Sequence, residues 1–271
     1  MTQYPVFAFL GWRFAIAAIV FAVIFAKPLR ASFASLHRPS LYTGLAAGAF
    51  LTAGYVFQTV SLLPADQGGT TPARAAFLTG LYVVMVPVGQ FVIRRQKPRK
   101  GVVIGVALAL AGLWFLSGLT LSGASDWVWG DTMVLIAAFI YSAHMLTLGR
   151  TDESYSTTML AFIQLVVVAV VCMVMSVVTQ EQAPFIPPSS LVWFSIIITG
   201  VFGSAFAFGI QTWAHQVMVP ASVALILVLE PAFGGAIGWL VAGSVVPHEF
   251  VGAMLMMLGM LASELLGTSR E

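Results

Sequence analysis

The chain contains very little charge. Of its 271 residues, 12 are lysine or arginine and 10 are aspartate or glutamate, so 8% are charged, against about 25% in an ordinary soluble domain. Hydrophobic residues make up 59% of the sequence. A soluble fold of this length needs many more polar side chains, because much of its surface contacts water. The composition excludes a soluble enzyme, a disordered protein and a nucleic-acid-binding protein, and it predicts a protein embedded in a lipid bilayer.

Cysteine and recognisable catalytic motifs are also scarce. Cys172 is the only cysteine, which excludes an internal disulfide bond. The four histidines and this cysteine show no metal-ligand spacing. The sequence has no intramembrane aspartate pair, no Gly-x-Ser-x-Gly elbow and no phosphate-binding Gly-x-x-x-x-Gly-Lys loop. We therefore expect no cofactor, no metal site and no enzymatic activity, and a membrane-embedded enzyme acting on lipid is disfavoured.

Nine segments of the chain are long and apolar enough to be membrane-spanning helices. Crossing the hydrocarbon core takes about 20 apolar residues. The segments are continuously apolar for about twice the length of a barrel strand, which disfavours a β-barrel. The predicted fold is an all-α integral membrane protein with nine transmembrane helices. The predicted spans are 6–26, 41–63, 73–93, 101–121, 128–149, 157–179, 191–213, 220–242 and 250–267.

The distribution of basic residues predicts the orientation of these helices. Ten of the 12 lysine and arginine residues follow the first, third or fifth span or lie in the C-terminal tail. Loops rich in lysine and arginine remain in the cytoplasm. We therefore expect a multi-pass protein of the inner (plasma) membrane, with a cytoplasmic C-terminus and an N-terminus on the outer side.

An internal repeat relates the two halves of the chain. Residues 72–82 align with residues 220–230 at a shift of 148, and Gln58 aligns with Gln211 at a shift of 153. The glycines that match at a shift of 147 are Gly105 with Gly252 and Gly112 with Gly259.

This repeat predicts two domains of the same architecture. Residues 1–121 form the first repeat, with four of five helices, and residues 122–271 form the second, with all five. Inverted repeats of this kind are typical of transporters. We expect two inverted five-helix repeats, in which the first helix of repeat one is missing from this chain through truncation, a late start codon or genuine loss.

Glu230 is an acidic residue in the middle of a predicted span. An intramembrane carboxylate is costly and usually faces a cavity, where it carries a proton or binds a cationic group. Pro231 removes a backbone hydrogen bond and is expected to kink the helix. The alternative is a protonated or hydrogen-bonded glutamate that fixes two helices together. Tyr82 is the counterpart of Glu230 in the first repeat, where a packing role is favoured.

Two arginines lie within predicted spans. Arg74 is able to attract an anionic solute, although a side chain that reaches the outer headgroups is the favoured interpretation. Arg13 lies deeper in its span. Its side chain either reaches the headgroups or forms an ion pair with the missing helix. Asp131, near the start of its span, is expected to be a helix-dipole partner or a cap.

Buried amides and a histidine complete the candidates. Gln58 and Gln211 either bind solute or bridge helices, and bridging is the more common role. His144 shares a helix face with Tyr141 and is interpreted as a core histidine or a proton relay. The candidate substrate-binding or coupling residues are Glu230, Gln58, Gln211, Tyr82, His144 and Arg74.

Several segments resemble a known family. Residues 72–87 are similar to the mid-repeat segment of EamA-like permeases in the drug/metabolite transporter superfamily, and residues 211–214, 220–221 and 229–233 resemble its second-repeat signature. The resemblance implies ten helices in two inverted five-helix repeats, a central cavity, and transport of small metabolites by alternating access. Where members commonly carry Gly-Glu, this chain has Gly243-Ser244 and Arg94-Arg95.

Together these features predict a secondary carrier. We expect it to export or exchange a small polar or amphipathic metabolite, of amino-acid-like or drug-like chemistry, by alternating access through a central cavity. Its partners are the small-molecule substrate, the bilayer and a coupling proton or counter-solute, since no nucleotide-binding motif is present. The alternatives are a non-transporting membrane scaffold and an inactive truncated carrier.

Overall fold

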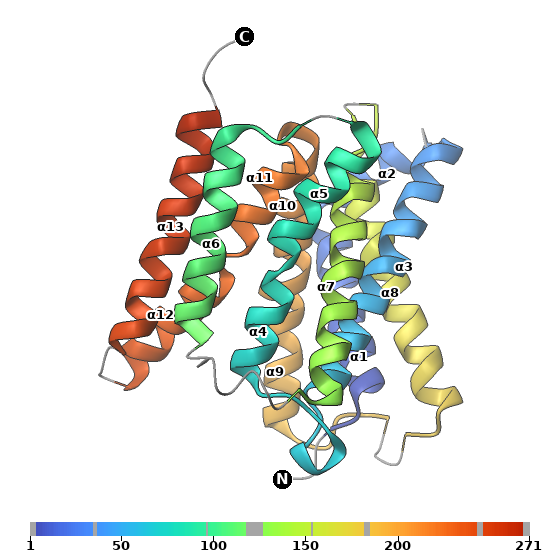
Figure 1. The fold of residues 1–271 in the computed structure, drawn as a ribbon. Helices are drawn as coiled ribbons and strands as arrows, with labels where there is room; N and C mark the ends of the chain where they lie inside the picture. Colours follow the sequence, from blue (N-terminus) through green and yellow to red (C-terminus); the bar gives the residue numbers. More distant parts are fainter. Residues whose placement is uncertain are drawn as a thin grey trace. The chain divides into compact units, whose positions relative to one another are not determined.

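The computed structural model describes residues 4–34, 37–95, 97–117, 127–152, 154–181, 185–242 and 246–267, and all its regular elements are helices (Figure 1). The predicted all-α fold is confirmed. Seven helical segments of this part are long and apolar enough to cross a membrane. They coincide with the first seven predicted spans, and they are Val6–Ile24, Arg38–Ser61, Pro72–Ile93, Lys100–Ser117, Trp129–Leu148, Thr157–Val178 and Ser190–Val217.

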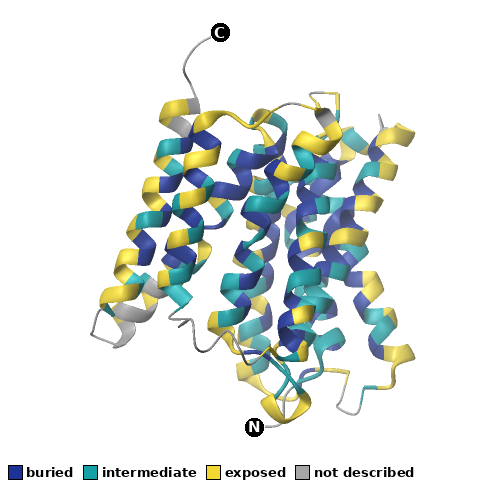
Figure 2. Cartoon of the chain, viewed as in Figure 1, coloured by how far each residue is buried: buried dark blue, intermediate teal, exposed yellow. Residues whose placement is uncertain are grey.

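Many large apolar side chains remain exposed on these helices (Figure 2). Val92, Leu191 and Leu240 are 69%, 69% and 84% exposed. A soluble protein rarely leaves so many such residues in contact with water. These surfaces fit contact with lipid, while the buried faces of the same helices pack on their neighbours.

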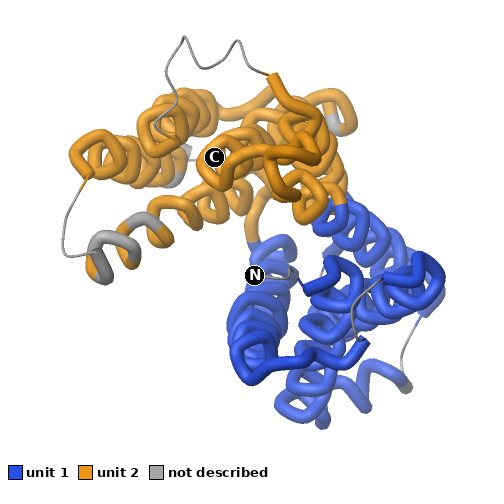
Figure 3. The backbone as a smooth tube through the Cα atoms, turned by 90° about the horizontal axis from the view of Figure 1, so that it is seen from below, with its two compact units in different colours: residues 1–56, 147–217 blue, residues 57–146, 218–271 orange. Residues whose placement is uncertain are grey.

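The chain divides into two compact units, each of which combines two segments that are separated in the sequence (Figure 3). Unit 1 comprises Met1–Val56 and Thr147–Val217, and unit 2 comprises Phe57–Leu146 and Met218–Glu271. Each unit therefore draws on both predicted repeats. The predicted boundary at residues 121 and 122 lies outside the described residues, so the division into repeats stays a prediction.

Unit 1 is organised around α1, which packs along α8 and against α9 and η3. Gly11 permits this approach, because a Cβ atom there would lie 2.8 Å from the Met173 side chain. Ser156 and Ser189 cap α8 and α9 with their hydroxyl oxygens. Its elements are α1 (Val6–Ile24), α2 (Ala26–Ala34), most of α3 (Arg38–Ser61), α8 (Thr157–Val178), α9 (Ser190–Gly200), the π-helical η3 (Val201–Phe206) and α10 (Ala207–Val217).

Unit 2 has a core of apolar side chains from α5, α6, α7, α11, α12 and α13. Tyr82 is the aromatic residue of this buried cluster. Besides the end of α3, the elements of unit 2 are η1 (Ala65–Gln67), α4 (Pro72–Gly80), α5 (Tyr82–Arg94), α6 (Lys100–Ser117), α7 (Trp129–Leu148, up to residue 146), α11 (Pro220–Leu227), α12 (Glu230–Ala242) and α13 (Pro247–Gly267).

Helices α6 and α13 pack closely in antiparallel orientation through glycines. A Cβ atom on Gly105 would lie 2.7 Å from the carbonyl oxygen of Gly259, and one on Gly112 would lie 2.6 Å from that of Gly252. Both distances are shorter than a van der Waals contact. Glycine is therefore required at these crossing points, as is common where membrane helices approach closely.

Two of the predicted spans are discontinuous helices. The span predicted at 73–93 consists of α4 and α5, and the span predicted at 220–242 consists of α11 and α12. The second interruption has a clear cause, because in a continuous helix the ring of Pro231 would clash with the carbonyl of Leu227, where α11 ends. The helix is therefore interrupted just before Glu230, where the sequence predicted a kink caused by Pro231.

Candidate functional site

The two interruptions share one kind of backbone hydrogen bond. At the first, the Leu81 N–H donates to the Leu78 carbonyl at 3.2 Å. At the second, the Leu229 N–H donates to the Ile226 carbonyl at 3.1 Å. Both are 3₁₀-type bonds, which tighten the chain at the junction of two helices. The two donors, and likewise the two acceptors, are separated by 148 residues, the shift of the sequence repeat.

Tyr82 and Glu230 are the first residues of the helices that follow these interruptions. Tyr82 is 8% exposed and lies in the core of unit 2, as the packing interpretation predicted. Glu230 is exposed, although it lies within a predicted span.

Gln58 bridges three helices of unit 2. The Tyr141 hydroxyl on α7 donates to Gln58 Oε1 at 2.8 Å, and Gln58 Nε2 donates to the Thr79 hydroxyl on α4 at 3.4 Å. This is the helix-bridging role that the sequence favoured. His144 is 1% exposed on α7. Gln211 is half-buried on α10 in unit 1, so the candidates fall in both units.

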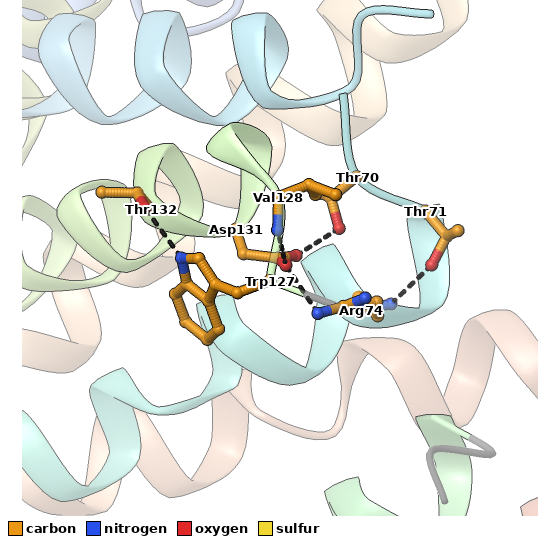
Figure 4. A network of polar contacts seen from close by, with 7 residues as sticks. All are labelled: Thr70, Thr71, Arg74, Trp127, Val128, Asp131 and Thr132. Carbon is orange, nitrogen blue, oxygen red and sulfur yellow. Dashed lines mark hydrogen bonds and ion pairs between the residues drawn. The ribbon is translucent and has the colours of Figure 1, made fainter. Parts of the chain in front are cut away.

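Arg74 forms an ion pair that the sequence interpretation did not include. One of its terminal nitrogens lies 2.6 Å from Asp131 Oδ2, and the two side chains are 17% and 0% exposed (Figure 4). The Thr70 hydroxyl donates to Asp131 Oδ1 at 2.5 Å, and the Val128 N–H donates to Oδ2 at 3.0 Å. Arg74 is thus held by an acidic side chain of unit 2.

Asp131 also has the capping role that was expected of it. It is the third residue of α7, and its carboxylate accepts the N–H of Val128, which directly precedes that helix. The same carboxylate holds Thr70, in the turn after α3, and Arg74, in the first turn of α4. This network therefore connects three segments at one end of unit 2 and has a structural purpose.

Arg13, which the sequence analysis left out of the candidate set, has several side-chain contacts in unit 1. Its Nε donates to the Ser204 hydroxyl at 2.9 Å, and Nη2 donates to the Gly203 carbonyl at 3.2 Å and the Tyr55 hydroxyl at 3.4 Å. The guanidinium carbon also lies 5.1 Å and 5.4 Å from the ring centres of Tyr55 and Phe14. The signal that could have identified it was a basic residue inside an apolar span.

Glu181 is a second residue whose role was not predicted. Its carboxylate accepts the N–H groups of Phe7 and Ala8 at 2.9 and 3.0 Å, and the Ser176 hydroxyl at 2.7 Å. It therefore neutralises the positive N-terminal end of α1. Partial burial raises the pKa of Tyr4, and the nearby Glu181 charge adds to this effect.

Unit 1 contains a pocket of about 320 Å³. Its wall is almost entirely apolar, with four aromatic side chains among the lining residues. This volume is at the lower end of the range for small-molecule sites, which combine apolar walls with a few polar groups. The pocket is lined by Phe21, Phe25, Thr157, Thr158, Ala205, Phe206, Gly209, Ile210 and Trp213.

Two comparisons of the sequence with known proteins indicate a transporter, and a third shows the fold. The profile of the EamA-like transporter family matches residues 128–263. A protein of Archaeoglobus fulgidus described as an uncharacterized transporter is 29% identical over 209 residues, which are 77% of this chain and 64% of that protein's length. A crystal structure described only as that of a protein has a TM-score of 0.75 at 17% identity, covering 98% of this chain and 89% of that one. At this identity, the structural likeness shows the fold alone.

Proposed function

Because the chain belongs to the EamA-like transporter family, we propose that this multi-pass membrane protein is a secondary carrier of the inner membrane. It exports or exchanges a small polar or amphipathic metabolite, of amino-acid-like or drug-like chemistry, by alternating access. The energy comes from a gradient of protons or of a counter-solute. The aromatic and aliphatic lining of the pocket in unit 1 is compatible with the apolar part of an amphipathic solute.

The matching interruptions of two helices carry this proposal. The α4–α5 and α11–α12 junctions have the same 3₁₀-type bond, 148 residues apart. Discontinuous helices at corresponding positions of two repeats are where transporters place substrate and coupling sites. The geometry therefore supports a pair of inverted repeats, proposed as 1–121 and 122–271. The residues that match the family profile fall inside the second of them.

The packing of α6 on α13 provides further support for inverted repeats. Gly105 and Gly112 correspond to Gly252 and Gly259 at a shift of 147. In the structure, Gly105 faces Gly259 while Gly112 faces Gly252. Such exchanged pairing is what a twofold axis between the two helices requires.

We assign the coupling role to Glu230. It begins a half-helix, is exposed within a proposed span, and is paired by the repeat with the buried Tyr82. Gln58, Gln211 and His144 remain proposed solute-binding or supporting residues. Arg74 also stays in the set, but its ion pair favours a supporting role.

The proposed orientation places the C-terminus in the cytoplasm. Within unit 2, the connection from α5 to α6 lies at the same end as the end of α13 (Figure 1). This connection contains Arg95, Lys97 and Arg99. Basic loops favour the cytoplasmic side. Arg270 and the Gly243-Ser244 pair lie outside the described residues.

Metabolite profiling tests the proposed function. Cells that express the parent chain, Glu230→Gln or the control Glu249→Gln are compared at equal membrane levels with cells that carry an empty vector. We expect a solute to accumulate in the medium with the parent and the control, and to be lost with Glu230→Gln. No difference between parent and empty vector would favour a non-transporting scaffold. Normal transport by Glu230→Gln, with the same pH dependence as the parent, would refute the coupling role.

A further inference from the structure

Arg13 lies deep in unit 1. It is seven residues from the start of α1, or about 10 Å along the helix axis at 1.5 Å per residue. Two of its hydrogen-bond partners, Gly203 and Ser204, lie at the middle of the span Ser190–Val217. The guanidinium is therefore held at the depth of the hydrocarbon core.

The described contacts of Arg13 do not neutralise its charge. They are made to two hydroxyls, one carbonyl oxygen and two aromatic rings, and no carboxylate is among them. Arginine stays protonated in proteins. An arginine at this depth faces the protein interior or water, since contact with lipid is too costly. None of these described contacts supplies a counter-ion to the guanidinium, which is partly exposed within the span.

The surrounding side chains hold the guanidinium in a defined orientation. Ser204 and Phe14 are both 0% exposed, so the groups that contact Arg13 are themselves fixed by packing. The described hydrogen bonds use Nε and Nη2 and leave Nη1 for a solute oxygen. Gly203 adds no side chain on this side, where a Cβ atom would contact Nη2 at 3.4 Å.

We infer that Arg13 binds the carboxylate of the transported solute. This inference rests on the proposed function and deepens it, because it names the substrate class as a monocarboxylate. One fixed positive charge is balanced by one negative charge, whereas a phosphate dianion would leave an uncompensated negative charge at the same depth. Arginine is suited to this role, since its planar donors match the geometry of a carboxylate.

Thermal unfolding of the purified full chain tests the inference. Cys172 is buried and is the only cysteine, so a thiol-reactive dye reports unfolding. The probes are acetate, butyrate, benzoate and phenylacetate, each beside its neutral amide. At roughly ten times the dissociation constant, we expect at least one acid to raise the unfolding temperature by about 2 to 4 °C, and no amide to do so.

Variants assign the effect to Arg13. The shift should disappear in Arg13→Gln, persist more weakly in Arg13→Lys, and be unchanged in the control Arg30→Gln on α2. The inference is overturned if no acid stabilises the parent, if amides act as well as acids, or if Arg13→Gln keeps the shift. Arg13→Lys keeps the test valid if Arg13→Gln does not fold.

Counterflow in proteoliposomes separates this inference from the proposed function. Carboxylate binding that needs Arg13, without transport of any solute, would contradict the carrier and retain the site. Transport of a neutral solute that is unaffected in Arg13→Gln would support the carrier and contradict the carboxylate site. Transport of a carboxylate that is lost in Arg13→Gln and retained in Arg30→Gln supports both.

Discussion

Arg74 and Arg13 both lie within predicted spans, but the protein holds them in opposite ways. Arg74 contacts the fully buried carboxylate of Asp131 at 2.6 Å, so its charge is neutralised inside unit 2. Arg13 is surrounded by hydroxyls, a carbonyl and aromatic rings in unit 1. These groups orient the guanidinium without cancelling its charge. The first arrangement joins segments of the fold, whereas the second leaves a charge for another molecule.

The contrast shows that an arginine in an apolar span is not sufficient to identify a binding site. Replacing one partner of a buried ion pair leaves the other charge uncompensated, which is strongly destabilising. Replacing an arginine that has only neutral partners leaves no buried charge behind. Stability and binding measurements therefore separate the two roles, and three comparisons follow in order of expected effect.

Breaking the Arg74–Asp131 pair should have the largest effect on stability. Arg74→Gln leaves Asp131 buried and unneutralised, and we expect a loss of about 3 kcal/mol in the free energy of unfolding. Arg13→Gln is the matched control and should cost less than Arg74→Gln, because its hydroxyl and carbonyl partners carry no charge that would be left uncompensated. Chemical unfolding of the purified variants measures both values. Equal losses would contradict the distinction between the two arginines.

Giving Arg13 a carboxylate partner should neutralise its charge within the protein, as Asp131 does for Arg74. In Ser204→Asp, the new carboxylate replaces the hydroxyl that accepts from Arg13 Nε at 2.9 Å. We expect stability to stay within about 1 kcal/mol of the parent, while the shift in unfolding temperature caused by carboxylic acids is lost. Ser204→Ala is the control that removes the hydroxyl and should keep the shift. A full shift in Ser204→Asp would show that solute binds elsewhere.

Asp152 provides a solvent-exposed carboxylate for comparison with Asp131, and its effect should be the smallest. Hydrogen bonds from the Ser154 side chain and backbone N–H lower the pKa of Asp152 from 3.8. The ionised form is thus favoured in the folded state, and its contribution is present above pH 3.8 and lost as the pH falls through the lowered pKa. Asp152→Asn should be slightly less stable than the parent at pH 7, and the difference should disappear in acid. A difference that grows in acid would contradict the assigned direction.

The interruptions of the helices could be predicted only in part. Pro231 marks the α11–α12 junction in the sequence, because proline cannot continue the hydrogen-bond pattern of the preceding turn. The α4–α5 junction at Leu81 has no adjacent proline, and the sequence there reads as one apolar span. Its position emerges from the structure, where Tyr82 packs into the core directly after the junction.

The charged contacts were the least predictable part. Asp131 and Arg74 are 57 residues apart in the sequence, and Arg13 and Ser204 are 191 apart. Periodicity and composition report on neighbours within a helix, and carry no information on such distant partners. The sequence identified each residue as unusual but assigned Arg74 to the headgroups and did not include Arg13 among the candidate site residues.

By itself, the sequence determined the membrane environment, the all-helical fold, the first seven spans and the family, because each depends on apolar length and local motifs. The tertiary structure alone decided which polar groups are neutralised and which remain available. The physical reason is that a charge within a span is stable only through contacts from other helices. Those contacts form when the helices pack, and they distinguish the two arginines.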